Sequence, residues 1–219
     1  MAATPTTPNL TDYVSFLSGV VGIPIEFLPT LLGTATDGTT AYLVDSTQNW
    51  NPDQWDGYTV TDLTQGLSTD VATSSTDTLS FVDSLSAPVI AGDEYLITPQ
   101  VVPMSLSIAL EIVNPALACA SAMMYGLAVY NLATDRLINY AVDQPGQTWF
   151  IDKRKEFRLA DARVGVVASA SNGETSMSYL NPEQMKLFTL QDLETLKTEW
   201  GRRYMGIAQK YGLSIWGIS

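Results

Sequence analysis

The chain has 219 residues, no His, one Cys and a formal net charge of −12 at pH 7. Without an imidazole, Ser-His-Asp and Cys-His catalytic systems are excluded, and so are zinc sites built on nitrogen and sulfur ligands. Because neither G-x-x-x-x-G-K-[ST] nor G-x-G-x-x-G is present, we expect a non-enzymatic protein with no cofactor and no metal, and only carboxylate chemistry stays open.

A short helix is expected near the start of the chain. Apolar residues recur at helical spacing, at Leu10, Tyr13, Val14 and Leu17. Thr11 or Asp12 can cap its first turn, and Gly22 followed by Pro24 ends the pattern.

Residues 33–98 are rich in Thr, Ser, Asp and Gly, and all 10 of their charges are acidic. Alternating patterns predict short strands at 41–44, 58–60, 78–82 and 95–97, with turn clusters between them. Such strands indicate a small antiparallel β sandwich or barrel. None of the Asp residues lies in a D-x-[DN]-x-[DN]-G calcium loop, so we interpret them as turn-capping residues. These are Asp37, Asp45, Asp53, Asp56 and Asp93.

Residues 104–113 and 115–140 predict two helices, separated by Asn114-Pro115. Residues 115–134 carry no charge, which meets the length criterion for a transmembrane helix. Their small side chains and the lack of a preceding basic flank instead favour a helix buried in a bundle or between subunits. Cys119 in this stretch is expected to be a small buried hydrophobe.

The last third of the chain mixes turns, strands and a final helix. Strands are expected at 148–151 and 164–168, and the charged run 152–156 is interpreted as a solvated mixed-charge face rather than a basic patch. Thr189 is expected to cap a helix over 190–210, and Gly212 to end it. The apolar end, residues 213–219, either folds back on its own core or inserts into a partner.

These elements indicate an α+β protein. Residues 1–32 and 99–219 form a helical core, and residues 33–98 form an inserted β domain.

The distribution of charge also divides the chain: residues 1–135 hold 14 acids and no base, and residues 136–219 hold 9 acids and 11 bases. The asymmetry is either a solubility bias or a sign that the two parts face different surroundings, since an all-acidic surface repels nucleic acid.

Three segments of the C-terminal half form a recognisable set. They are a small-residue helix at 120–128, a Ser/Gly-rich β stretch at 167–179, and a late helix at 198–208 that carries T-x-[YW]-G-x-x-[YF]. Through these segments the chain resembles, over roughly residues 104–211, the head–tail connector (adaptor) proteins of tailed bacteriophages. Residues 33–60 and 95–97 are similar to a small β module that recurs in phage virion and tail proteins, although the middle hairpin is short of Gly, Arg and Gln.

The resemblance implies a helical-bundle adaptor with an inserted β module. It also implies a dodecameric ring in the virion, beneath the portal, that contacts the portal and tail or nozzle proteins. The chain end of this family inserts at the outer rim of the portal. The expected portal or subunit interface is Arg202, Arg203, Tyr204, Tyr211, Leu213, Ile215, Trp216 and Ile218. DNA is expected to pass through without specific binding, with no membrane involved. The candidate channel-facing acids are Asp12, Glu26, Glu111 and Asp135.

Two alternatives remain. One is a tail or fibre subunit whose β module binds glycan through exposed Trp50, Trp55 and Tyr58, and burial of these rings would contradict it. The weaker one is a carboxylate-only glycosidase, which needs two acids about 5–9.5 Å apart across a cleft.

Overall fold

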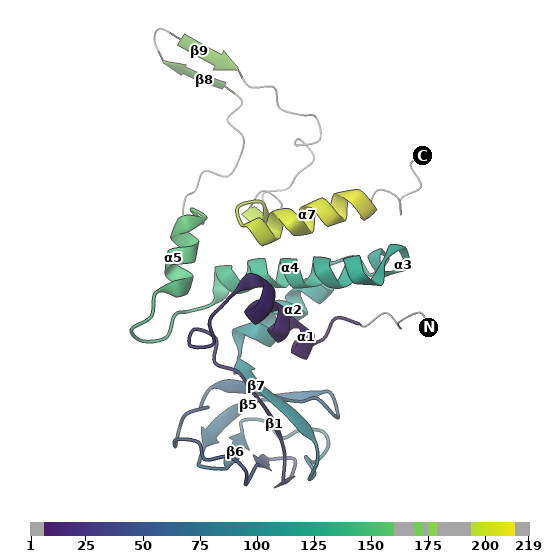
Figure 1. Ribbon diagram of the computed structural model, residues 1–219, viewed down its shortest axis with the longest axis vertical. Coiled ribbons are helices and arrows are strands. Elements are labelled where there is room, and N and C mark those ends of the chain that lie inside the picture. Colours follow the sequence, from purple (N-terminus) through teal and green to yellow (C-terminus); the bar gives the residue numbers. More distant parts are fainter. Residues whose placement is uncertain (1–6, 160–168, 173–174, 179–193, 213–219) are drawn as a thin grey trace. The chain divides into compact units, whose positions relative to one another are not determined.

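The computed structural model describes residues 7–159, 169–172, 175–178 and 194–212 (Figure 1). These residues form an α+β structure, as predicted, and its main sheet has seven antiparallel strands. The chain divides into two compact units. We call residues 8–108 the β unit and the described residues from 109 onward the helical unit.

The β unit begins with helix α1 (Leu10–Phe16), which continues as a π-helical turn over Leu17–Val21. The N-cap is Asn9, not Thr11 or Asp12, because the Asn9 side chain accepts from the backbone N–H of Asp12 at 2.8 Å. Gly22 ends the helix at φ 75°, a conformation that glycine adopts without strain. Tyr13 is fully buried, and its hydroxyl lies 3.3 Å from that of Ser105.

The strands of the β unit all pair antiparallel, in the order β1-β7-β4-β5-β6-β3-β2. Their bounds are β1 (Leu31–Thr34), β2 (Asp37–Gly38), β3 (Tyr42–Val44), β4 (Tyr58–Asp62), β5 (Leu67–Ser74), β6 (Thr78–Phe81) and β7 (Glu94–Pro99). The strands predicted at 41–44, 58–60, 78–82 and 95–97 are confirmed as β3, β4, β6 and β7. Strands β1, β2 and β5 were not predicted.

The sheet closes on itself. Its two end strands, β1 and β2, are joined by only Ala35 and Thr36, so one bent segment supplies both edges. Strand β5 pairs with β4 and then, after a bulge between Val71 and Thr73, with β6. Inside lies a cluster of buried side chains that includes Leu43, Trp50, Trp55, Val60, Val71, Leu79, Tyr95 and Ile97.

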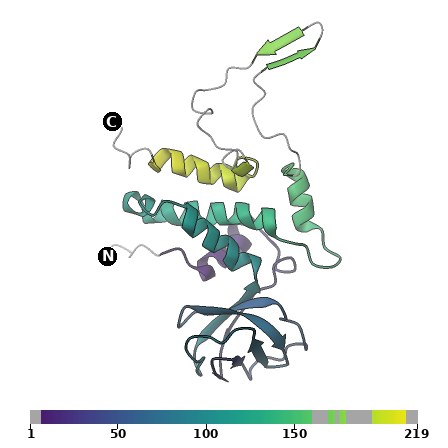
Figure 2. The same cartoon turned by 180° about the vertical axis from the view of Figure 1, so that it is seen from behind.

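Helix α2 (Val101–Ile112) follows β7, and the helical unit contains α3 (Leu117–Ala120), α4 (Ala122–Tyr140), α5 (Trp149–Glu156) and α7 (Glu199–Gly212). A separate hairpin pairs β8 (Ser169–Asn172) with β9 (Thr175–Ser178). Helix α7 lies alongside α4 in both views (Figures 1 and 2). None of the described helices has both the length and the apolar character needed to cross a bilayer.

The helix predicted over 115–140 is interrupted at Ser121. This residue is extended (φ −166°, ψ 114°), and its side chain accepts from Met124 N–H at 3.3 Å, so it caps a new helix. The prediction that Cys119 is buried was wrong: it is exposed on the short α3.

The strand predicted at 148–151 was also wrong, because these residues begin helix α5. The Asp143 carboxylate accepts from the backbone N–H groups of Phe150 and Ile151 at 2.7 and 2.8 Å, which satisfies donors that a first helical turn leaves unpaired. On α5, Lys153–Glu156 and Lys155–Asp152 form exposed ion pairs, in agreement with a solvated mixed-charge face. The strand predicted at 164–168 lies outside the described residues.

The final helix begins later than predicted. Glu194 and Thr195 are helical, the chain leaves the helix at 196–198, and α7 starts at Glu199. Thr198 supplies the cap, since its hydroxyl accepts from Gly201 N–H at 2.9 Å. The predicted cap Thr189 and the apolar end 213–219 lie outside the described residues.

Candidate functional site

Helix α4 contributes a buried polar patch to the interior of the helical unit. Asp135 and Thr134 are fully buried, and Arg136 is 8% exposed. The Arg136 guanidinium lies 3.7 Å from the Asp135 carboxylate and 3.4 Å from the hydroxyl of Thr195. A buried charge destabilises a fold unless it is paired and hydrogen-bonded, so the partners of these two residues matter.

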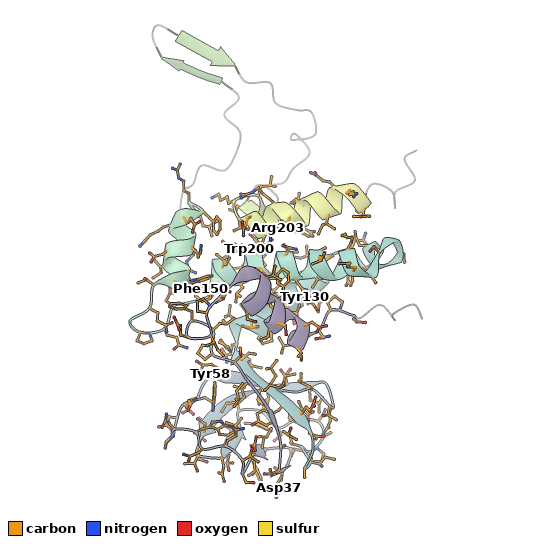
Figure 3. All side chains as sticks on the ribbon, in the orientation of Figure 1. Asp37, Tyr58, Tyr130, Phe150, Trp200 and Arg203 are labelled. Carbon is orange, nitrogen blue, oxygen red and sulfur yellow. The ribbon has the colours of Figure 1, made fainter. Side chains whose placement is uncertain are left out.

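Thr198 connects this patch to α7. Its hydroxyl donates to Asp135 at 2.5 Å while accepting from Gly201 N–H. Trp200, labelled in Figure 3, is 4% exposed. It lies edge-on to Phe157, with ring centroids 5.6 Å apart. A Cβ on Gly201 would lie 1.7 Å from the carbonyl oxygen of Thr195, so the close approach requires glycine. Three residues of the T-x-[YW]-G pattern, Thr198, Trp200 and Gly201, therefore each have a distinct packing or hydrogen-bonding role here.

The electrostatics of Asp135 are unfavourable. Burial raises the pKa of this carboxyl to about 6, even though the hydrogen bond from Thr198 and the charge of Arg136 act to lower it. One of its oxygens, Oδ2, is buried and has no hydrogen-bond partner in the described ranges. Arg136 therefore only partly compensates this acid.

A pocket of about 220 Å³ opens beside Arg136. Among its described lining residues, Arg136, Asn139 and Tyr140 lie near the end of α4, and Leu159 lies in the turn that follows α5. Glu194 and Lys197 come from the segment before α7. The Lys197 ammonium donates to the Leu159 carbonyl at 3.4 Å. The Nε of Arg136 is buried and has no hydrogen-bond acceptor among the residues that the structure describes. The described lining of the pocket thus joins two cations to one carboxylate and two polar side chains.

The predicted interface residues on α7 differ in environment. Arg202 and Arg203 are exposed, and Tyr204 and Tyr211 are half-buried. Arg202 donates to the carbonyls of Leu196 and Lys197 at 3.1 and 2.9 Å, and Arg203 lies 4.0 Å from Glu199 (Figure 3). Leu213, Ile215, Trp216 and Ile218 lie outside the described residues.

The candidate channel acids do not share one environment. Asp12, Glu26 and Glu111 are exposed, whereas Asp135 has no exposed surface. Asp135 is therefore corrected from a channel-facing acid to an interior residue, because its carboxylate is occupied by Thr198 and Arg136.

Both tryptophans of the β unit lie in its core. Trp50 and Trp55 are 6% and 5% exposed, and the half-buried Tyr58 lies edge-on to Trp55 at 5.3 Å. Tyr95 is fully buried and donates to Asp45 at 2.7 Å. Two of the three rings required for a glycan-stacking platform are thus enclosed, which contradicts that arrangement.

Three acids of the β unit accept from backbone N–H groups of nearby turns, and two of them, Asp45 and Asp93, were predicted to do so. Asp56, also predicted to cap a turn, accepts instead from the N–H and hydroxyl of Ser74. Asp45 accepts from Thr47 N–H and Asp93 from Ile90 N–H, and Asp62 accepts from Thr64 and Gln65 N–H. Burial acts to raise the pKa of Asp45, but hydrogen bonds from Thr47, Tyr95 and Gln48 together lower it. Burial and the neighbouring Asp93 raise the pKa of Asp62. Within the described ranges, no group of three or more acidic or Cys side chains is close enough to hold a metal ion.

Sequence reasoning missed the pocket residues Arg136 and Lys197, and Thr195, to which Arg136 donates. One signal was available: Arg136 is the first base of the chain and directly follows an acid at the end of a long uncharged stretch.

Comparison with protein-family models, with curated proteins and with solved structures gave no match for this chain.

Proposed function

We propose that this chain is a structural virion subunit, a head-to-tail adaptor that forms a ring beneath the portal and joins capsid to tail. The observation that carries the proposal is the contact between α4 and α7. Thr198, at the start of the late helix on which the resemblance to phage connectors partly rests, donates to Asp135 of α4. Trp200 and Gly201 of the same pattern pack against Phe157 and the Thr195 backbone, and so fix the start of α7. The finer architecture, a helical adaptor core with an inserted β module and twelve copies in the ring, belongs to the same proposal.

The distribution of charge supports assembly. A ring built from identical copies needs two different surfaces that complement one another. Every Lys and Arg lies at or after Arg136, and residues 8–108 carry only acids. The chain therefore supplies an all-acidic β unit, whereas residues 109–219 hold every base together with 11 acids.

The proposed docking surface for the portal is α7 together with the chain end. Arg202 and Arg203 are exposed on this helix and available to acidic or carbonyl groups of a partner. Asp12, Glu26 and Glu111 remain candidates for a wall past which DNA slides, since carboxylates offer no phosphate-binding site.

Native mass spectrometry of the purified protein, alone and with portal rings, tests the proposal. We expect a closed oligomer, alone or on the portal, and stoichiometric binding to the portal. Truncation after Gly212, or Arg202→Ala with Arg203→Ala, should weaken portal binding while circular dichroism stays unchanged. Lys155→Ala on α5 is the matched control and should bind normally. A protein that stays monomeric both alone and with portal would contradict the proposal.

A further inference from the structure

The pocket beside Arg136 contains a buried cation with unused donors. A guanidinium has five N–H donors. In the described part of the chain, Arg136 directs one of them to Thr195 at 3.4 Å, lies 3.7 Å from Asp135, and has no acceptor for Nε. At 8% exposure it is also largely withdrawn from water.

The other lining groups suit a carboxylate. Lys197 adds a second cation, and Asn139 and Tyr140 add an amide and a phenol. Among the lining residues that the structure describes, the acid is Glu194, which is exposed and lies on the same short helical segment as Thr195. The planar guanidinium of an Arg binds carboxylates in a defined geometry, a nearby Lys adds positive charge, and 220 Å³ accommodates one acidic side chain with water.

We infer that the Arg136 pocket receives a carboxylate side chain from the β unit of a second copy of this chain. The β unit, residues 8–108, contains 12 acids and no base, so it is an all-acidic partner for a cationic pocket. Pocket and acids lie on different units, so each copy uses both surfaces, and contacts made head-to-tail build the proposed ring. The inference rests on the proposed function, because it names the surfaces through which copies of the proposed ring associate.

Two kinds of variant separate the two surfaces. The pocket variants are Arg136→Gln and, at the half-buried rim where folding is less at risk, Lys197→Glu. The acid variant replaces every exposed Asp and Glu of residues 8–108 with Asn or Gln. Lys155→Glu is the control, with the same charge change as Lys197→Glu but on the exposed face of α5. Circular dichroism checks that each variant is folded.

Sedimentation velocity at 50 and 300 mM NaCl measures the association. We expect the self-association of each pocket variant and of the acid variant to be roughly thirtyfold weaker than that of the wild type. Lys155→Glu should associate normally, and the self-association of the wild type should weaken at the higher salt. A mixture of Lys197→Glu with the acid variant should form a one-to-one dimer that grows no further. In that dimer, the intact pocket of the acid variant binds the intact acidic surface of Lys197→Glu, and neither copy has a second functional surface for further growth.

The outcomes distinguish the two proposals. If the wild type assembles and folded Lys197→Glu or the acid variant assembles equally well, the inference is overturned and the proposed ring stands. A mixture that forms no dimer also overturns the inference. A wild type that does not self-associate, alone or on the portal, overturns both.

Discussion

Replacing Asp135 with Asn tests the energetic account of the buried patch between α4 and α7. The Asn side chain retains an oxygen that can accept the hydrogen bond from Thr198, but it cannot ionise. The variant therefore removes the titration of this residue while keeping its shape and its contact with α7.

The magnitude follows from the pKa. Folding moves the pKa of Asp135 from 3.8 to about 6, chiefly through burial. A difference of about two pKa units corresponds to roughly 3 kcal/mol. Because the folded pKa is raised, the folded state keeps a proton that the unfolded state has already lost between these two values. The free energy of unfolding of the wild type should thus fall as pH rises from about 4 to about 7, and Asp135→Asn should lack this fall.

Urea unfolding followed by the helical circular dichroism signal at pH 4.5 and 7.5 measures the effect. The stability of Asp135→Asn relative to wild type should increase between these pH values by about 2 to 3 kcal/mol. The control is Asp152→Asn on α5, where hydrogen bonds from Thr148 and Lys155 lower the pKa, so its relative stability should not change over this range. An equal difference between Asp135→Asn and wild type at both pH values would refute the reasoning.

Two glycine substitutions test close approaches in the two units. Gly201→Ala should destabilise the helical unit by about 3 kcal/mol or more in urea unfolding, because its Cβ meets the Thr195 backbone, whereas Gly206→Ala on the same helix, with open space around it, should stabilise by about 0.5 to 1 kcal/mol. Equal effects of the two changes would contradict the close contact. Gly33→Ala should destabilise the β unit by about 2 to 3 kcal/mol, measured by Trp fluorescence, because its Cβ meets the Tyr95 ring at 2.4 Å and displaces the hydroxyl that donates to Asp45. Thr34→Ala, exposed on the same strand, should change stability by less than about 0.5 kcal/mol, and a Gly33→Ala protein as stable as this control would disprove the prediction.

Sequence patterns predicted those elements whose signals are local. Strands β3, β4, β6 and β7 have alternating side chains with turn residues on both sides, and they form where expected. Helix α2 likewise follows from its own apolar spacing. The α+β class could therefore be predicted, and so could the change from β to helix near residue 100.

The incorrect boundaries depend on single hydrogen bonds. Nothing in the apolar pattern from 115 to 140 marks Ser121 as a break, since a serine is tolerated within a helix and becomes a cap only when the chain turns there. Trp149-Phe150-Ile151 favours a strand by composition, and the carboxylate of Asp143 that starts α5 comes from several residues upstream. The Arg136 pocket is less predictable still, because it joins residues nearly 60 positions apart.

The two roles suggested for the acids of the β unit compete with one another. In the proposed ring, a carboxylate that enters the Arg136 pocket of a neighbouring copy is neutralised and leaves the solvent, so it contributes little field to a channel. Asp135, once a candidate for the channel wall, is already buried against Thr198 and Arg136 within its own unit. Of the three exposed candidates, Asp12 and Glu26 belong to the acidic β unit and are available for either role, whereas Glu111 lies outside it. An acidic channel wall and an acidic subunit contact thus require two separate sets of carboxylates. Neutralising one exposed acid at a time assigns each carboxylate to one role, since only the loss of a contact acid weakens association.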